Sequence, residues 1–149
     1  MESKNAYVKE AFALLEQVNS AITKEYESLL NHELTPKQLL LLRTVRDEQK
    51  ITVNFLSEKL SLSPSSLSQL ISRLEVANYL EREVNVNNRR EVFVMLGEKG
   101  VALFQNYDDI DQDIINKYYS EFTLEEVMTF RNLVKKLHSV IGKRGEGNE

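Results

Sequence analysis

The sequence predicts a mainly α-helical fold of the α+β class, in which long helices at both ends flank two short helices and a hairpin. Three observations predict it. Apolar residues recur at intervals of three and four through both ends of the chain, as they do on one face of a helix. Only two prolines and five glycines occur among 149 residues, so regular structure should dominate. Two short runs near the middle have the alternating apolar pattern of β-strands.

The first helix should reach about Leu30 and fall within residues 1–34. Its apolar stripe consists of Val8, Ala11, Leu15, Val18, Ile22, Tyr26 and Leu29. The second helix should start at Pro36, because Thr35 can cap it and Gln38 can complete a capping box. Proline suits this position, since its missing N–H has no partner in the first turn.

Residues 51–83 have the pattern of a helix-turn-helix, two short helices joined by a tight turn. Thr52 can cap the first helix, and Ser63, followed by Pro64, can cap the second. The inward face of the second helix consists of Leu67, Leu70, Ile71 and Leu74. Its start and its outer face carry small hydroxyls, one amide and one arginine, namely Ser63, Ser65, Ser66, Ser68, Gln69, Ser72 and Arg73.

The outer face of that second helix suits DNA. Small polar side chains let a helix approach base edges and phosphates closely, and Glu75 is the only acidic neighbour. The alternative is an ordinary solvated face, but such faces usually carry Glu and Lys. We therefore expect the polar residues from Ser63 to Arg73 to contact DNA.

The two strand-like runs, YLEREV and EVFVML, should form a hairpin directly after the helix-turn-helix. The asparagine-rich turn between them places Arg89 and Arg90 at the tip, since asparagine tolerates left-handed backbone. Arginine in a minor groove responds to groove width and neutralises phosphate, so both residues should contact DNA. The alternative is a charged tip that keeps an exposed hairpin from aggregating. Residues 35–100 would form this DNA-binding lobe.

Two more helices should follow in residues 101–149. Their apolar stripes consist of Leu103, Tyr107, Ile110, Ile114 and Tyr118, and then of Val127, Phe130, Val134, Leu137 and Ile141. Thr123 and Glu126 mark the start of the last helix, and Gly142 fits its end. The terminal helices could pack within one chain or against a second copy, and periodicity alone leaves both open.

The order of these elements resembles the MarR family of multiple-antibiotic-resistance regulators, which are bacterial winged-helix proteins. The resemblance covers most of the chain and is most specific in the wing. The wing stretch NRREVFVMLGEKG supplies Asn88, Arg89, Arg90, Leu96, Gly97, Lys99 and Gly100 in register. The stretch SRLEVANYLER resembles the end of the family's recognition helix and supplies Leu74, Leu80 and Arg82.

This resemblance implies a transcriptional repressor that binds double-stranded DNA at a pseudo-palindromic operator and is released by a small-molecule effector. It also implies a homodimer held by the first and last helices. The residues expected at that dimer interface are Val8, Leu15, Ile22, Val134, Leu137 and Ile141.

Three residues depart from the family's pattern. Asn88 stands where the family has an aspartate that helps hold the wing arginine, and it brings no charge to this support. Gly97 replaces a threonine that caps the next helix, a change that costs little by capping alone. Asn78 replaces a frequent glycine, and asparagine also tolerates a left-handed turn.

The sequence lacks the residues that an enzyme or a metal site requires. Cysteine is absent, and there is neither a glycine-rich phosphate loop nor a nucleophile elbow. His32 and His138 are the only histidines and lie far apart, so zinc is not expected. We expect no catalytic residue, no metal and no cofactor. The remaining alternative is a winged-helix module that binds protein instead of DNA.

Net charge is −4, which alone does not favour nucleic acid. DNA binding depends on where charge lies, however, and from Lys59 to Arg90 five basic residues outnumber three acidic ones. The chain has no apolar run of ~18 residues and no signal-peptide pattern, so we expect no membrane span and a cytoplasmic location.

Overall fold

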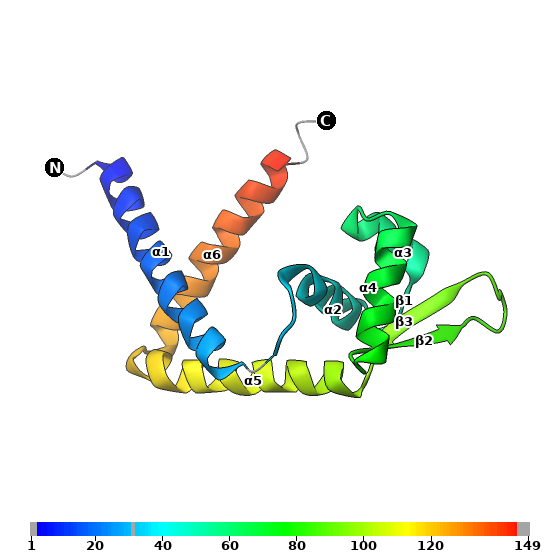
Figure 1. Ribbon diagram of the computed structural model, residues 1–149. Coiled ribbons are helices and arrows are strands. Elements are labelled where there is room, and N and C mark those ends of the chain that lie inside the picture. The colour runs from blue at the N-terminus through cyan, green and yellow to red at the C-terminus, as the bar shows by residue number, and fades with distance from the viewer. Residues whose placement is uncertain (1–2, 31, 146–149) are drawn as a thin grey trace. The chain divides into compact units, whose positions relative to one another are not determined.

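The computed structural model describes residues 3–30 and 32–145. The chain forms two units, one ending at Asp109 and the other beginning at Ile110, and each is described by itself. Helices dominate both units, and one small sheet completes the first (Figure 1). The predicted mainly α-helical, winged fold with long terminal helices is therefore confirmed.

The first unit begins with two helices that start as the sequence predicts. Helix α1 (Lys4–Leu29) is capped by Ser3 and has no buried residue along its length. Helix α2 (Pro36–Glu48) is capped by Thr35, whose hydroxyl accepts from the N–H of Gln38. The Gln38 side chain accepts the Thr35 N–H in return, at 2.9 Å, and so completes the capping box.

The helix-turn-helix consists of α3 (Val53–Leu60) and α4 (Pro64–Val76). Thr52 caps α3 and Ser63 caps α4, each accepting a backbone N–H from the first turn, so both predicted caps are confirmed. Between the helices Ser61 takes a left-handed conformation, with φ of 51°.

The sheet has three antiparallel strands, β1 (Ile51–Thr52), β2 (Leu80–Val84) and β3 (Val92–Leu96), in the order β1-β3-β2. Strands β2 and β3 are the two arms of the predicted hairpin. Strand β1 was not predicted, and it pairs Ile51 with Val94. This pairing places the start of α3 beside the hairpin.

A tight turn precedes β1. Gln49 has φ of 63° and ψ of −51°, and the Lys50 N–H donates to the Glu48 carbonyl at 2.7 Å. This is a γ-turn with a positive φ at its central residue, a conformation that is rare and strained for any residue with a side chain. The neighbouring Lys50 side chain forms an ion pair with Glu83 on β2, at 3.0 Å.

The first unit has a single apolar core beneath the helix-turn-helix and the sheet. Its fully buried members come from α2, α3, α4, β2 and β3, and they are Leu41, Leu42, Val45, Leu56, Leu67, Ile71, Leu74, Leu80 and Val94. Leu103 and Phe104 of α5 (Glu98–Tyr118) also belong to this core. The predicted inward face of α4 is thus buried, with Leu70 only partly so.

The start of α5 lies very close to the turn that follows α4. Asn78 takes the expected left-handed conformation there, with φ of 63°. A Cβ at Gly97 would lie 2.6 Å from the Asn78 carbonyl oxygen, and one at Gly100 would lie 2.3 Å from the Tyr79 carbonyl oxygen. Neither position has room for a Cβ atom, so both must be glycine. Gly97 was predicted only as a helix cap, and its close approach to Asn78 was not predicted.

The second unit contains the end of α5, a short 3₁₀ turn (Tyr119–Glu121) and α6 (Leu124–Gly145). Thr123 and Glu126 form the predicted capping box, with distances of 3.2 and 2.8 Å. The prediction that α6 ends at Gly142 is wrong. The helix continues to Gly145, because Gly142 keeps helical backbone angles and takes no left-handed cap conformation.

The terminal helices expose their apolar stripes. On α1, Phe12, Leu15 and Val18 are each exposed by between 41 % and 58 %. On α6, Leu137 is 48 % and Ile141 62 % exposed. No helix in the described part of the chain is both long and apolar enough to cross a membrane.

Candidate nucleic-acid interface

Helix α4 has two faces of opposite character. The face against the core carries Leu67, Ile71 and Leu74, each at most 1 % exposed. The opposite face, together with the start of the helix, is exposed and consists of Ser63, Ser65, Ser66, Ser68, Gln69, Ser72 and Arg73. The residues that the sequence predicted for DNA contact on this helix therefore share one accessible surface.

Hydroxyl groups cluster at the start of α4. The Ser63 Oγ accepts from the Ser66 N–H at 3.2 Å, and the two hydroxyls lie 2.9 Å apart. The Ser65 hydroxyl lies 3.3 Å from that of Ser63. A helix start carries partial positive charge from its free N–H groups, so these hydroxyls surround a place that favours a phosphate.

The hairpin turn is built from two consecutive β-turns, each begun by an asparagine. Asn85 and Asn88 each accept, through backbone oxygen, an N–H three residues further on, at 3.2 and 2.9 Å. Each side-chain oxygen also accepts the N–H two residues on, from Asn87 at 3.0 Å and from Arg90 at 3.2 Å. Asn88 therefore supports the wing by fixing the backbone of Arg90.

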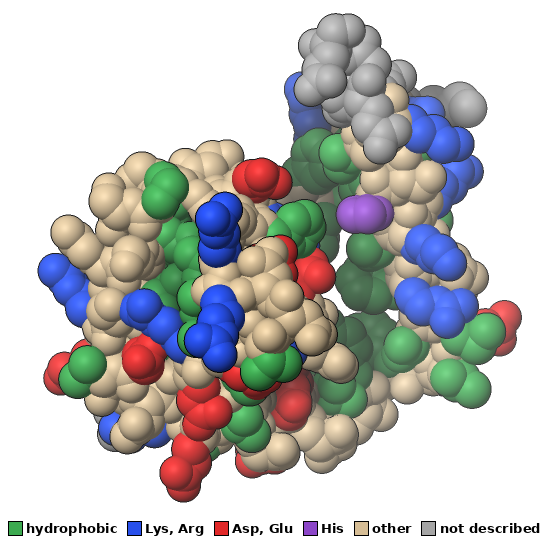
Figure 2. All heavy atoms as spheres, turned by 90° about the vertical axis from the view of Figure 1, so that its right-hand side faces the viewer, with side chains coloured by type: hydrophobic (Ala, Val, Ile, Leu, Met, Phe, Trp, Pro, Cys, Tyr) green, Lys and Arg blue, Asp and Glu red, His purple; other side chains and the backbone are tan. Residues whose placement is uncertain are grey.

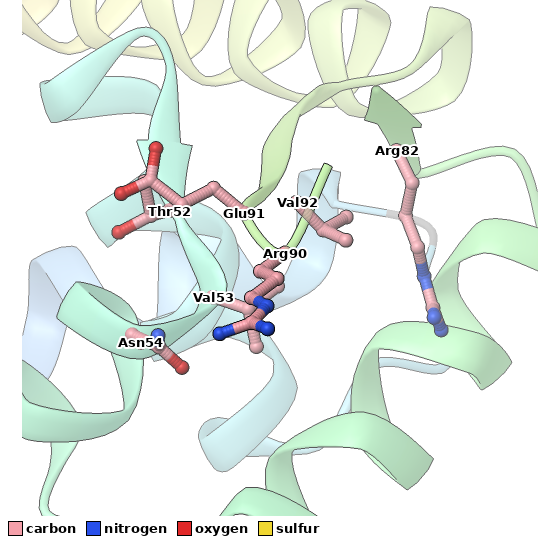
Figure 3. A pocket seen from close by; sticks show the side chains of 7 residues that line it. All are labelled: Thr52, Val53, Asn54, Arg82, Arg90, Glu91 and Val92. Atoms are coloured by element: carbon pink, nitrogen blue, oxygen red, sulfur yellow. The ribbon is translucent and has the colours of Figure 1, made fainter. Parts of the chain in front are cut away.

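Arg89 and Arg90 occupy the two middle positions of the second turn, and both are exposed. The Arg90 side chain extends toward the start of α3, beside Val53 (Figure 3). It helps line a hollow of about 200 Å³ together with Thr52, Val53, Asn54, Arg82, Glu91 and Val92. The wing arginine and the helix-turn-helix thus meet in one local surface.

Arg82 also belongs to this surface, and its role was not predicted from the sequence. Its Nη2 donates to the Ser72 Oγ at 2.6 Å, and its Nε forms an ion pair with Glu75 Oε2 at 2.7 Å. The resemblance named Arg82 only as part of a motif. Its contacts join a strand to a helix across ten residues of sequence, so no local spacing could have indicated them.

The charge of the wing side of the lobe is mixed. Figure 2 looks onto this side and shows Lys and Arg side chains interspersed with Asp and Glu. Several of the acids are paired, including Glu83 with Lys50 and Glu75 with Arg82. Each pair neutralises one base as well as one acid, so the small positive surplus counted from the sequence is unchanged by pairing.

Comparison with known proteins finds similarity to transcriptional regulators. A family model described as the MarR family matches residues 34–92, which contain the helix-turn-helix and most of the wing. The HTH-type transcriptional regulator SarZ of Staphylococcus epidermidis is 28 % identical over 145 residues, which cover 96 % of this chain and 95 % of that protein. The chain is thus similar to the MarR family over its helix-turn-helix and most of its wing.

Two further proteins similar to this chain are also regulators. The HTH-type transcriptional repressor MdtR of Bacillus subtilis is 27 % identical over 111 residues, covering 74 % of this chain and 72 % of that protein. A mutant of MarR from E. coli, solved as a complex with operator DNA, is 26 % identical with a TM-score of 0.57, covering 91 % of this chain and 99 % of that one. The relatives are named as regulators, which confirms the prediction that the chain is not an enzyme.

Proposed function

We propose that this chain is a homodimeric, sequence-specific DNA-binding repressor that recognises a pseudo-palindromic operator. The observation that carries the proposal is the exposed outer face of α4. It presents small hydroxyls, an amide and an arginine, and its one nearby acid, Glu75, is paired with Arg82. A similar solved protein, MarR of E. coli, was captured with operator DNA.

In the proposed complex α4 enters the major groove. Gln69 and Arg73 read base edges, since an amide can pair with adenine and a guanidinium with guanine. The serines mostly contact phosphate and fix the position of the helix. Gln69→Ala should change the preference among operator bases by ~1–3 kcal/mol if its contact is bidentate. Affinities for operators altered one base pair at a time measure this change in preference. An equal loss of affinity on every sequence would mean that Gln69 does not read a base.

The wing contacts the adjacent minor groove through Arg89 and Arg90. Support comes from the turn, which holds the Arg90 backbone through Asn88 and leaves both guanidinium groups exposed. Arginine in a narrow minor groove meets an enhanced negative potential. The wing therefore adds affinity and sensitivity to groove width.

The proposed dimer uses the apolar stripes of α1 and α6. Both helices expose large apolar side chains along most of their length, including those at the predicted interface positions Val8, Leu15, Val134, Leu137 and Ile141. Ile22 of the same stripe is half-buried. Contiguous exposed apolar surface is unusual for a monomer and marks a protein interface. Two-fold symmetry then places two α4 helices on half-sites about one helical turn apart.

Repression and release by a small molecule complete the proposal. Repression is supported by the name of the relative MdtR. Release is supported by an aromatic cluster within the first unit, where Tyr107 contacts Tyr26 and Phe104, with ring centroids 5.9 and 6.0 Å apart. The Arg43 guanidinium lies 5.5 Å from the Tyr107 ring centre. Aromatic faces beside a cation suit a phenolic or anionic ligand.

The test is retardation of DNA from just upstream of the protein's own gene. We expect a specific complex, a footprint with dyad symmetry, and affinity that falls steeply with salt as counterions are released. If the purified protein retards no DNA at low salt, the protein-binding alternative replaces this proposal.

A further inference from the structure

Arg82 connects the wing to the outer face of α4 through two different contacts. It projects from β2, where its backbone pairs with Val94 of β3. Figure 3 shows its side chain leaving the other lining residues of the hollow and extending toward α4. One nitrogen donates to the Ser72 hydroxyl at 2.6 Å, and another pairs with the Glu75 carboxylate at 2.7 Å. The 2.7 Å distance is that of a good charge-assisted contact, and the 2.6 Å distance is shorter still.

The contact with Glu75 changes the charge of the surface. Glu75 is the only acid on α4, and its side chain is 44 % exposed. A free carboxylate near Ser72 would repel the phosphates of any DNA in contact with this helix. Pairing with Arg82 cancels that charge locally.

The contact with Ser72 fixes the polarity of a hydroxyl. An arginine can only donate hydrogen bonds, so the Ser72 oxygen must be the acceptor. The hydroxyl proton of Ser72 is then directed away from Arg82. Since Ser72 is exposed on the outer face, this proton is available to an external acceptor.

We propose that Arg82 is a positioning residue that presents Ser72 to DNA as a hydrogen-bond donor and shields the DNA from Glu75. This inference rests on the proposed DNA binding and deepens it. The partner of Ser72 is an acceptor on DNA, either a phosphate oxygen or a major-groove base acceptor, namely a purine N7, guanine O6 or thymine O4. The exocyclic amines of adenine and cytosine are excluded as partners, because they are donors.

Both contacts need the planar fork of an arginine. The guanidinium offers several N–H groups in fixed directions, whereas a lysine offers one compact charge. Arg82 is also only partly accessible, with its side chain 34 % exposed. It therefore acts on DNA through Ser72 and Glu75 and makes no direct contact of its own.

The experiment measures affinity by fluorescence anisotropy for the upstream DNA fragment that the parent protein retards. Arg82→Ala should weaken binding about fivefold to tenfold, since it uncovers Glu75 and frees the Ser72 hydroxyl to rotate. Adding Glu75→Gln to Arg82→Ala should restore affinity to within about threefold of the parent. Arg82→Lys, which keeps the charge but loses the fork, should give an intermediate loss.

Lys50→Ala is the matched control. It also removes one positive charge and one ion pair to β2, that with Glu83, but it leaves α4 untouched. Its affinity should stay within about twofold of the parent. Thermal unfolding of each variant separates a loss of fold from a loss of DNA affinity in a folded protein. Glu75→Gln should rescue only the part of the affinity loss that comes from the uncovered carboxylate.

Modified DNA identifies the partner of Ser72. Ser72→Ala should weaken binding to ordinary DNA, and this loss should vanish on DNA that lacks the acceptor. Methylphosphonate substitution at single phosphates tests the phosphate oxygen, and 7-deazapurine substitution tests N7. If Ser72→Ala binds every DNA as tightly as the parent does, the Ser72 hydroxyl donates no hydrogen bond to DNA and the proposal is wrong.

The outcomes separate this inference from the function on which it rests. A parent protein that binds no DNA overturns both. If the parent binds DNA but the affinity loss caused by Arg82→Ala persists in full after Glu75→Gln, the inference alone is overturned. Arg82 is then a direct DNA contact.

Discussion

The winged lobe and the terminal helices carry the same kind of apolar stripe but treat it in opposite ways. In the lobe, Leu41, Leu56 and Leu67 are fully buried. On α1 and α6, apolar residues of the predicted stripes, such as Val18 and Leu137, are 47 % and 48 % exposed. The lobe therefore buries its own hydrophobic surface, whereas the terminal helices leave theirs exposed. Amphipathic periodicity shows that a face will be buried, but it does not show against what.

The sharpest test of the lobe compares two adjacent leucines on α2. Leu41 is 0 % and Leu40 is 55 % exposed. Leu41→Ala should lower the free energy of unfolding by about 2–5 kcal/mol, because it removes buried methyl groups and leaves a cavity. Leu40→Ala should change it by less than about 1 kcal/mol. Denaturant unfolding measures both, and equal losses would mean that the lobe is not a self-contained core.

The terminal helices should respond through assembly. Leu137→Glu places a charge in the proposed interface, so the dimer should dissociate, and specific DNA affinity should fall by at least about tenfold as the second half-site is lost. Asn132→Glu adds the same side chain on another face of α6 and is the control. Mass in solution at micromolar concentration decides the matter, and a parent that is already a 17.3 kDa monomer contradicts the dimer.

The same change, glycine to alanine, should have opposite effects on stability in the two regions. Gly100→Ala should destabilise the protein by about 1–3 kcal/mol, because the new Cβ would meet the Tyr79 carbonyl at 2.3 Å and the turn would have to move. Gly142→Ala, with nothing within 4 Å, should stabilise α6 by about 0.5–1 kcal/mol. Melting temperatures compared at equal protein concentration test the two signs. The same sign at both positions would count against the close approach at the start of α5.

The smallest expected effect concerns the wing arginine Arg90, which is proposed to contact DNA. Arg90→Ala should leave the fold and the proposed dimer unchanged, since the residue contributes to neither apolar surface. It should weaken specific and non-specific DNA binding alike, and make the slope of log affinity against log salt shallower by about one unit for each arm that loses a phosphate contact. Unchanged binding at both low and moderate salt would leave the paired arginines without a DNA role.

Local features of the fold could be predicted because their causes are local. The caps Thr35, Thr52, Ser63 and Thr123 depend on residues within one turn, and all four are confirmed. The end of the last helix was placed too early, because Gly142 permits a left-handed cap without requiring one. Strand β1 was missed because two residues are too short to show a pattern.

Features that depend on distant residues could not be predicted. The polar face of α4 follows from helical spacing and was identified, as were the wing arginines. The bridge from Arg82 to Ser72 depends on how β2 lies against α4, which no sequence period encodes. Likewise, the spatial need for Gly97 becomes visible only when Asn78 is placed beside it.

Strand β1 has a consequence for how the lobe folds in time. Pairing Ile51 with Val94 closes a chain loop of about forty residues that contains the whole helix-turn-helix and one arm of the wing. Contacts so distant in sequence form late, after the local helices and the hairpin, and slow the approach to the native state. The strained turn at Gln49 can persist only once this pairing holds it, so both should form in the same late step. A growing polypeptide would therefore complete its DNA-reading surface only after the second arm of the wing had been synthesised.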